Sequence, residues 1–182
     1  SRYVLNTTLS PAQFRSQMGS VKLVGVFVDA DEKVLVETVR KWQLDLVQLH
    51  GNESPAYCQR IRKQVKTIKA IRIGDQTNLA SLVEQFADSV DYFLFDTLGK
   101  GYGGTGTKFD WSKIAAVPLT IPFFLSGGIG LDDLMSILQL KQTASLLYSV
   151  DINSRFETAP GVKDLQMIHQ FIHEIKKVKT HD

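Results

Sequence analysis

Residues 92–111 read Tyr-Phe-Leu-Phe-Asp-Thr-Leu-Gly-Lys-Gly-Tyr-Gly-Gly-Thr-Gly-Thr-Lys-Phe-Asp-Trp. The apolar and aromatic start of this stretch predicts a buried strand that ends in a carboxylate, Asp96. A long glycine-rich loop follows. Asp110, directly before Trp111, is then placed to cap a short helix. Enzymes with alternating strands and helices carry catalytic groups where buried strands end beneath loops. We therefore expect chemistry at Asp96.

The composition is that of an ordinary globular protein, because 43% of the 182 residues are hydrophobic and 22% are charged. The length predicts a single domain over residues 1–182. A net charge of +2, without a basic stripe interleaved with aromatics, argues against nucleic acid as a partner. No apolar run reaches membrane-spanning length and no signal peptide is visible, so no membrane partner is expected. The single cysteine, Cys58, precludes an intrachain disulfide framework and favours the cytoplasm.

Apolar strands and amphipathic helices alternate on both sides of the opening stretch. We expect strands at residues 21–28, 44–50, 67–73, 92–96, 121–125 and 146–150. Helices are predicted after Ser10-Pro11, from Asp29 as cap through Trp42, after Ser54-Pro55, after Thr77 or Asn78, after Asp110, over 131–138, and over 162–179 with Leu165, Ile168, Ile172 and Ile175 facing the core. Strands that are apolar on both faces and separated by helices predict a parallel sheet covered by helices.

Two parallel architectures compete, an open doubly wound sheet and a (β/α)₈ barrel. Residues 101–106 match the dinucleotide pattern G-x-G-x-x-G, but they lie in a long loop in mid-chain. No second strand ends in an acid about 20 residues further on, which argues against a nucleotide site. Polar residues at the predicted strand ends favour the barrel, where such ends share one face: Asp29, Gln48, His50, Arg72, Asp96, Ser126 and Asp151.

The last two strands carry the signs of a phosphate site. Ser126-Gly127-Gly128 follows one of them, and Asn153-Ser154 follows the other. Small residues let backbone N–H groups approach phosphate oxygens, and barrels commonly bind phosphate after their seventh and eighth strands. Six strands do not close a barrel of eight, and barrels usually have about 200 residues or more. If the last two strands are the seventh and eighth, we expect the missing pair before Ser1.

Short motifs in a fixed order span the chain. They are Ser1-Arg2-Tyr3-Val4, Val24-Gly25-Val26-Phe27-Val28, Val47-Gln48-Leu49-His50-Gly51, Phe95-Asp96-Thr97, Gly103-Gly104-Thr105-Gly106, Phe109-Asp110-Trp111, Leu125-Ser126-Gly127-Gly128, Asp151-Ile152-Asn153-Ser154 and Ala159-Pro160-Gly161-Val162-Lys163-Asp164. Together they resemble the phosphoribosylanthranilate isomerase family of tryptophan biosynthesis. The resemblance implies a (β/α)₈ TIM barrel of which these residues supply strands three to eight, lacking the first strand, first helix and second strand.

The resemblance also implies an Amadori rearrangement of a small sugar-phosphate substrate, N-(5-phosphoribosyl)anthranilate. An acid and a base suffice, so no cofactor or metal is expected, and the enzyme is expected to be a monomer or homodimer in the cytoplasm. Asp96 matches the general acid, because a carboxyl group partly buried at a strand end can retain a proton. The other matched positions are Arg2 for the anthranilate carboxylate, His50 and Asp151 near the substrate, and Gly104, Ser126, Gly127, Gly128, Asn153 and Ser154 for phosphate.

Two positions depart from the family pattern. The general-base cysteine of the family, in a Lys-Ile-Cys-Gly type motif, is absent, and Cys58 cannot replace it from within its helix. Residues 1–182 alone are therefore expected to be inactive. The family usually has glycine soon after Asn153-Ser154, where this chain has Arg155-Phe156. Arg155 either adds a phosphate contact or accompanies a different loop shape.

The sequence is open to three other interpretations. Another phosphate-binding barrel, such as indole-glycerol-phosphate synthase, is disfavoured because its catalytic lysines are not evident. A non-catalytic barrel fragment would act by association through open sheet edges. His169 and His173 have the spacing of zinc ligands on a helix, but the glutamate of that pattern is missing, so no metal site is expected.

Overall fold

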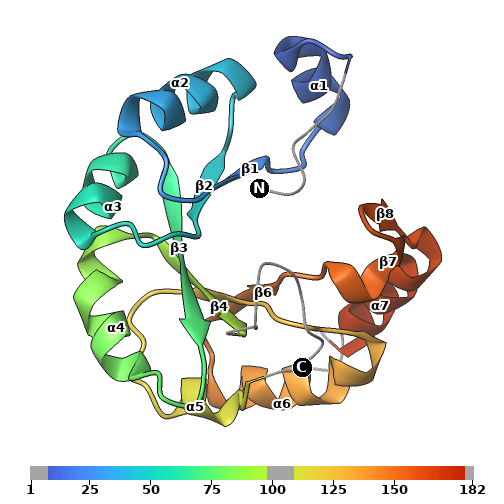
Figure 1. Cartoon of the computed structure of the whole chain (residues 1–182). Coiled ribbons are helices and arrows are strands. Elements are labelled where there is room, and N and C mark those ends of the chain that lie inside the picture. Colours follow the sequence, from blue (N-terminus) through green and yellow to red (C-terminus); the bar gives the residue numbers. More distant parts are fainter. Residues whose placement is uncertain (1–7, 98–108, 179–182) are drawn as a thin grey trace. The chain divides into compact units, whose positions relative to one another are not determined.

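The computed structural model describes residues 8–97 and 109–178, so Arg2 and Gly104 lie outside the described part. Strands and helices alternate along it (Figure 1). The strands are β1 (Val24–Phe27), β2 (Leu46–Leu49), β3 (Lys66–Ile73), β4 (Tyr92–Thr97), β5 (Phe123–Leu125), β6 (Leu147–Val150), β7 (Glu157–Ala159) and β8 (Val162–Lys163). The α-helices are α1 (Pro11–Met18), α2 (Glu32–Trp42), α3 (Pro55–Arg62), α4 (Leu79–Phe86), α5 (Ser112–Ala115), α6 (Leu134–Thr143) and α7 (Leu165–Val178), and the 3₁₀ helices are η1 (Ala87–Ser89), η2 (Leu131–Asp133) and η3 (Ser154–Phe156).

The sheet has the predicted parallel pairing. Its strand order is β1-β2-β3-β4-β5-β6, and the pairs β1–β2, β2–β3 and β5–β6 are parallel. In the β1–β2 pair Val24 lies opposite Leu46, and in the β2–β3 pair Leu46 lies opposite Lys66. Parallel strands that helices cover read as continuous apolar runs, as seen in the fully buried Phe93 and Phe95 of β4. The expected α/β class is confirmed.

Close contacts divide the chain into two compact units. The first extends to Ile71 and includes Ser81–Leu94, and its core contains the fully buried Leu35, Leu49 and Ile61. The second comprises Arg72–Ala80 and the residues from Phe95 onward, with Phe123 and Phe156 fully buried. Each unit contains strand ends that were predicted to carry functional side chains.

Two helix starts follow their local signals, but two predicted caps were misassigned. Ser10 caps α1 in a capping box, and Ser54 caps α3. The N-cap position of α5 is held by Trp111, so the prediction of Asp110 as the cap was wrong, although Asp110 Oδ1 accepts the Ser112 N–H at 2.9 Å. The cap of α2 is Asp31, which accepts the N–H groups of Lys33 and Val34, so the prediction of Asp29 was wrong. Asp29 has a φ of 49° and instead accepts the Asn52 N–H at 2.6 Å.

Helix α1 is attached to its unit without burying any residue. Its Arg15 donates to Asp45 at 2.7 Å, and Phe14 meets the Trp42 ring edge-on at 5.9 Å. Asp45 accepts the backbone N–H of Leu23, and this bond together with Arg15 and Lys22 lowers the pKa of Asp45 to about 2. The charged carboxylate of Asp45 therefore anchors α1 through its bond with Arg15.

The C-terminal part differs most from expectation. The second strand of a short antiparallel hairpin, β8 of β7–β8, occupies Val162–Lys163, where the last helix was predicted to start, and α7 begins only at Leu165. Leu165 and Ile172, predicted to face the core, are 66% and 42% exposed. The buried stripe of α7 centres on Phe171, whose ring lies 5.1 Å from that of Phe156. Leu165 and Ile172 fall at its margin, because successive helical residues are rotated by about 100°.

Candidate active site

Three strand ends of the second unit, which carry the predicted site residues Asp96, Ser126 and Asp151, come together. The Ser126 N–H donates to the Phe95 carbonyl at 2.8 Å, and the Asp151 N–H donates to the Leu125 carbonyl at 2.8 Å. These bonds place the end of β5 between the ends of β4 and β6. The Ser126 hydroxyl then donates to Asp151 Oδ2 at 3.1 Å. Ser126 is buried and Asp151 is exposed, so the pair runs from the protein interior to the surface.

Asp96 is half-buried in β4. Its Oδ1 accepts the backbone N–H of the next residue, Thr97, at 2.9 Å. A carboxyl group held in this way keeps a fixed orientation at the strand end.

Gly127 fits against the end of β4 because it has no side chain. Its φ is 96°, and a Cβ atom there would lie 2.4 Å from Thr97 Oγ1 and 2.8 Å from Thr97 N. Thr97 Oγ1 also accepts the Phe109 N–H at 3.3 Å. The loop after β5, the end of β4 and Phe109, three residues before α5 begins, therefore meet at Thr97.

We expect Gly127→Ala to destabilise the protein more than Gly19→Ala. Gly19 also has a positive φ, 55°, but a Cβ atom added there would meet no neighbouring atom within 4 Å. G19A reports the conformational cost alone, whereas G127A adds a steric contact with Thr97, worth roughly 1–3 kcal/mol more. Urea unfolding of both variants measures the difference. Equal losses of unfolding free energy would contradict the packing of Gly127 on Thr97.

The second predicted phosphate loop, Asn153-Ser154, is exposed and is supported by the β7–β8 hairpin. Lys163 Nζ donates to Asn153 Oδ1 and, at 2.7 Å, to Glu157 Oε1. The Gly161 N–H donates to Glu157 Oε2 at 3.3 Å. The bond from Lys163, followed by that from Gly161, lowers the pKa of Glu157. Sequence reasoning missed this support, although Pro160-Gly161 is a turn signal that could have indicated a hairpin.

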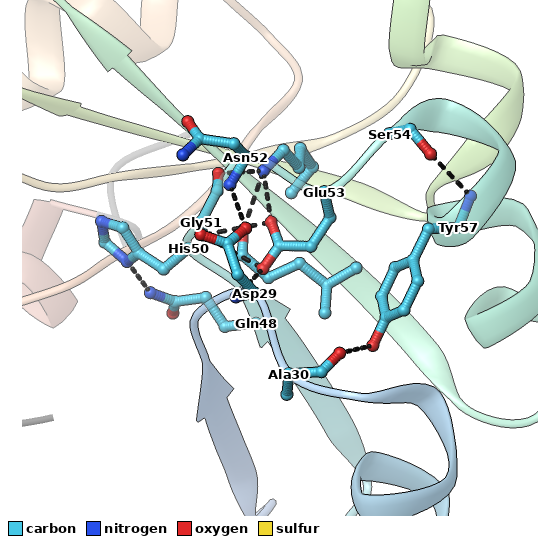
Figure 2. A network of polar contacts seen from close by, with 11 residues as sticks. Asp29, Ala30, Gln48, His50, Gly51, Asn52, Glu53, Ser54 and Tyr57 are labelled. Carbon is cyan, nitrogen blue, oxygen red and sulfur yellow. Dashed lines mark hydrogen bonds and ion pairs between the residues drawn. The ribbon is translucent and has the colours of Figure 1, made fainter.

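His50 is the predicted site residue of the first unit, at the end of β2. Its ring Nδ1 lies 2.7 Å from the Nε2 of Gln48, and its backbone N–H donates to the Phe27 carbonyl at 2.8 Å. Figure 2 shows the two side chains directed toward each other. Gln48 is buried, so its side chain offers a fixed partner to the half-buried imidazole ring of His50.

A buried ion pair that the sequence reasoning did not identify joins Glu53, three residues after His50, to Lys69 of β3. Lys69 Nζ and Glu53 Oε2 are 2.7 Å apart, and their side chains are only 5% and 2% exposed. Lys69 also donates to the Gly51 carbonyl at 2.8 Å. Glu53 accepts the N–H groups of Asp29 and Gly51 at 3.0 and 3.1 Å (Figure 2). The signal was a lysine inside the apolar run Thr67–Ile73, which a buried partner must compensate.

The family can now be identified from comparisons with known proteins. A family profile described as N-(5'phosphoribosyl)anthranilate (PRA) isomerase matches residues 5–174. The chain belongs to this family. The isomerases of Parabacteroides distasonis and Rhodopseudomonas palustris are 39% and 38% identical to it over 161 and 164 residues. These matches cover 88% and 87% of this chain, and 72% and 73% of those proteins.

Solved structures of PRA isomerases share the fold. The enzyme from Thermotoga maritima superposes with a TM-score of 0.75 and 28% identity, covering 93% of this chain and 82% of that one. A PRA isomerase in complex with reduced 1-(o-carboxyphenylamino)-1-deoxyribulose 5-phosphate gives a TM-score of 0.71 and 26% identity, covering 93% and 80%. The parallel strands and helices thus match those of PRA isomerase TIM barrels. The expected activity, PRA isomerisation in tryptophan biosynthesis, is confirmed, and the synthase alternative is set aside.

Cys58 does not offer the base that the PRA isomerase reaction needs. It lies in α3, is fully buried, and burial raises the pKa of its thiol to about 11. Such a thiol is protonated at neutral pH and does not reach a ligand. Among residues 8–97 and 109–178, no cluster of three or more histidine, cysteine or acidic side chains is placed to hold a metal ion. No helix in that part is long and apolar enough to cross a membrane.

Proposed function

We propose that Asp96 is the general acid of the PRA isomerase reaction. It gives its proton to the furanose ring oxygen as the bond from that oxygen to C1 breaks, and the anthranilate nitrogen forms a Schiff base with C1. A base then removes the C2 proton, and the resulting enolamine tautomerises to the aminodeoxyribulose product. The observation that carries this proposal is the packing of Gly127 on Thr97, which holds the loop after β5 next to the half-buried Asp96.

The substrate phosphate is assigned to the loops after β5 and β6. Gly127 and Gly128 have φ values of 96° and 65°, a local conformation in which successive backbone N–H groups can converge on an anion. Ser126, Asn153 and Ser154 complete the set, and Gly104 is assigned to it from the family motif. An N–H cradle of this kind binds a phosphate dianion without requiring a basic side chain.

The remaining substrate contacts are assigned to His50, Asp151 and Arg2. His50 is supported by the hydrogen bond to Gln48, which fixes its ring, and Asp151 by the bond from Ser126. Arg2 is assigned to the anthranilate carboxylate, because a planar guanidinium matches a planar carboxylate.

The six sheet strands are assigned as the third to eighth of a (β/α)₈ barrel, and residues 1–182 as a single barrel domain that acts in the cytoplasm. The strand order begins with β1 and ends with β6. On β1, Val24 and Val26 are 43% and 55% exposed, which is unusual for the apolar residues of a parallel strand. A further barrel strand beside β1 would cover such residues. The enzyme is a monomer or homodimer; a related Thermotoga maritima structure is described as monomers generated from a dimeric isomerase.

Residues 1–182 contain one cysteine, Cys58, and it is not assigned as the general base because it is fully buried within α3. A polypeptide of these residues alone is therefore expected to show no measurable turnover of PRA. Extending it with the N-terminal strand–helix–strand segment of a relative, including the Lys-Ile-Cys-Gly motif, is expected to produce turnover in a steady-state assay. The matched control carries serine in place of that added cysteine. Turnover by residues 1–182 alone, or by the serine control at the same rate, would show that the base lies elsewhere.

A further inference from the structure

Arg155 belongs to η3 in the loop after β6, and its side chain reaches the loop after β5. Its Nη2 is 3.0 Å from Asp132 Oδ1, and its Nη1 is 3.8 Å from Asp133 Oδ2. The same Nη1 donates to the Gly128 carbonyl at 3.4 Å. One guanidinium therefore joins the loop after β6 to the loop after β5.

The carboxylates beside Arg155 would disfavour an anion if they were unpaired. Asp133 is buried and accepts the Gly130 N–H at 2.7 Å, so its charge is fixed just beyond Gly127-Gly128. Asp132 is more exposed but lies in the same turn, η2. Like charges at such short range weaken the binding of a phosphate dianion unless a cation compensates them. Arg155 is placed to compensate both.

Gly130 leaves room for the Arg155 guanidinium because it has no side chain. A Cβ atom on Gly130 would lie 2.6 Å from Arg155 Cζ. The backbone of Gly130 is extended, with φ −137° and ψ −176°, a conformation that alanine adopts readily. A side chain at this position would therefore have to displace the ends of the Arg155 and Asp132 side chains.

We propose that Arg155 is a positioning residue for the substrate phosphate. It ties the two loops together and neutralises Asp132 and Asp133, while the backbone N–H groups contact the phosphate. This assignment rests on the proposed phosphate site. The sequence left open whether Arg155 adds a phosphate contact or accompanies a different loop shape. In the structure its guanidinium is directed to the carboxylates of Asp132 and Asp133 and to the Gly128 carbonyl.

The test compares binding of reduced 1-(o-carboxyphenylamino)-1-deoxyribulose 5-phosphate with binding of its dephosphorylated counterpart, by calorimetry on the complete protein. We expect Arg155→Gln to weaken the phosphorylated ligand by about tenfold and to leave the dephosphorylated one unchanged. Arg60→Gln is the charge-matched control, because Arg60 pairs with Glu32 at 2.8 Å in the first unit. It should change neither affinity.

Two further variants separate positioning from direct phosphate contact. Asp132→Asn in the R155Q background should restore part of the lost affinity, because it removes an uncompensated charge. No recovery would favour direct contact and overturn the proposal. Gly130→Ala should weaken the phosphorylated ligand in the wild type but add little in R155Q. An unchanged affinity in G130A would also overturn it.

The outcomes distinguish this inference from the function on which it rests. If the wild type binds the phosphorylated ligand and R155Q binds it equally well, Arg155 has no positioning role. If R155Q loses both ligands equally, its role is merely structural and the inference fails. If the wild type does not bind the phosphorylated ligand, the proposed phosphate site is wrong, and the inference fails with it.

Discussion

Asp96→Asn in a catalytically complete form of the enzyme is expected to lower kcat by about 10²–10⁴-fold, the usual contribution of general acid–base catalysis. Ligand affinity should change little, because asparagine has nearly the same shape. Its carbonyl oxygen can still accept the Thr97 N–H, which Asp96 Oδ1 accepts at 2.9 Å. The amide has no acidic proton to give to the ring oxygen of the substrate. Steady-state kinetics and binding of the reduced product analogue provide the two measurements.

Asp110→Asn is the matched control for this substitution. Asp110 lies in the same stretch of sequence, but its carboxylate accepts the Ser112 N–H at 2.9 Å at the start of α5. The side-chain oxygen of asparagine can accept the same N–H, so D110N should retain both kcat and stability. If D96N retained normal turnover, or if both variants lost activity equally, Asp96 would not be the acid.

Lys69→Met is expected to destabilise the first unit by about 3–5 kcal/mol, the usual effect of removing one partner of a buried ion pair. The substitution preserves much of the side-chain volume but leaves the Glu53 carboxylate, whose side chain is 2% exposed, without its cation. Two backbone carbonyls, those of Leu49 and Gly51, also lose a donor. Chemical denaturation measures the loss of unfolding free energy.

The control for K69M is an exposed pair of the same charge type. Arg60 and Glu32 lie 2.8 Å apart, but their side chains are 53% and 42% exposed. Arg60→Met should therefore cost only about 0–1 kcal/mol. Adding Glu53→Gln to K69M should recover part of the loss, because a neutral amide is easier to bury than a carboxylate. Equal losses for K69M and R60M would mean that burial adds nothing to the Lys69–Glu53 pair.

The same ion pair predicts a direction for acid sensitivity. Burial alone would raise the pKa of Glu53, but the hydrogen bonds from Lys69 and from the Asp29 N–H outweigh it and hold the pKa below the ordinary 4.5. The stabilisation is therefore complete above that ordinary value, where both folded and unfolded forms are ionised. It is lost as the pH falls toward the folded-state pKa, because the unfolded carboxyl binds its proton first. E53Q should lack this part of the acid dependence.

Local signals predicted the fold well, whereas long-range contacts lay beyond them. Ser10 and Ser54 are caps because each side chain bonds to backbone only three residues away. Asp29 also resembles a cap, but its carboxylate bonds to Asn52 in another loop, and Asp31 caps the helix instead. The margin of α7 was misjudged for a similar reason, since Phe156 determines which face is buried.

In the candidate site, too, local signals could be predicted and long-range contacts could not. The positions of Asp96, Ser126 and Asp151 at strand ends could be expected from a parallel sheet, and the structure brings the three ends together. Their catalytic and binding roles stay predictions. What the pattern could not indicate was pairing between distant charges: Lys69 with Glu53, and Arg155 with Asp132. Such pairs depend on side-chain direction, which alternation of apolar residues does not encode.

Helix α1 has a consequence for how this sequence can change over generations. It buries no residue and depends chiefly on Arg15 with Asp45 and on the contact of Phe14 with Trp42. Substitutions at exposed positions away from such contacts usually alter stability by less than about 0.5 kcal/mol. The rest of the helix can therefore drift widely among relatives while these anchors persist. Divergence in this segment says little about divergence of the active site.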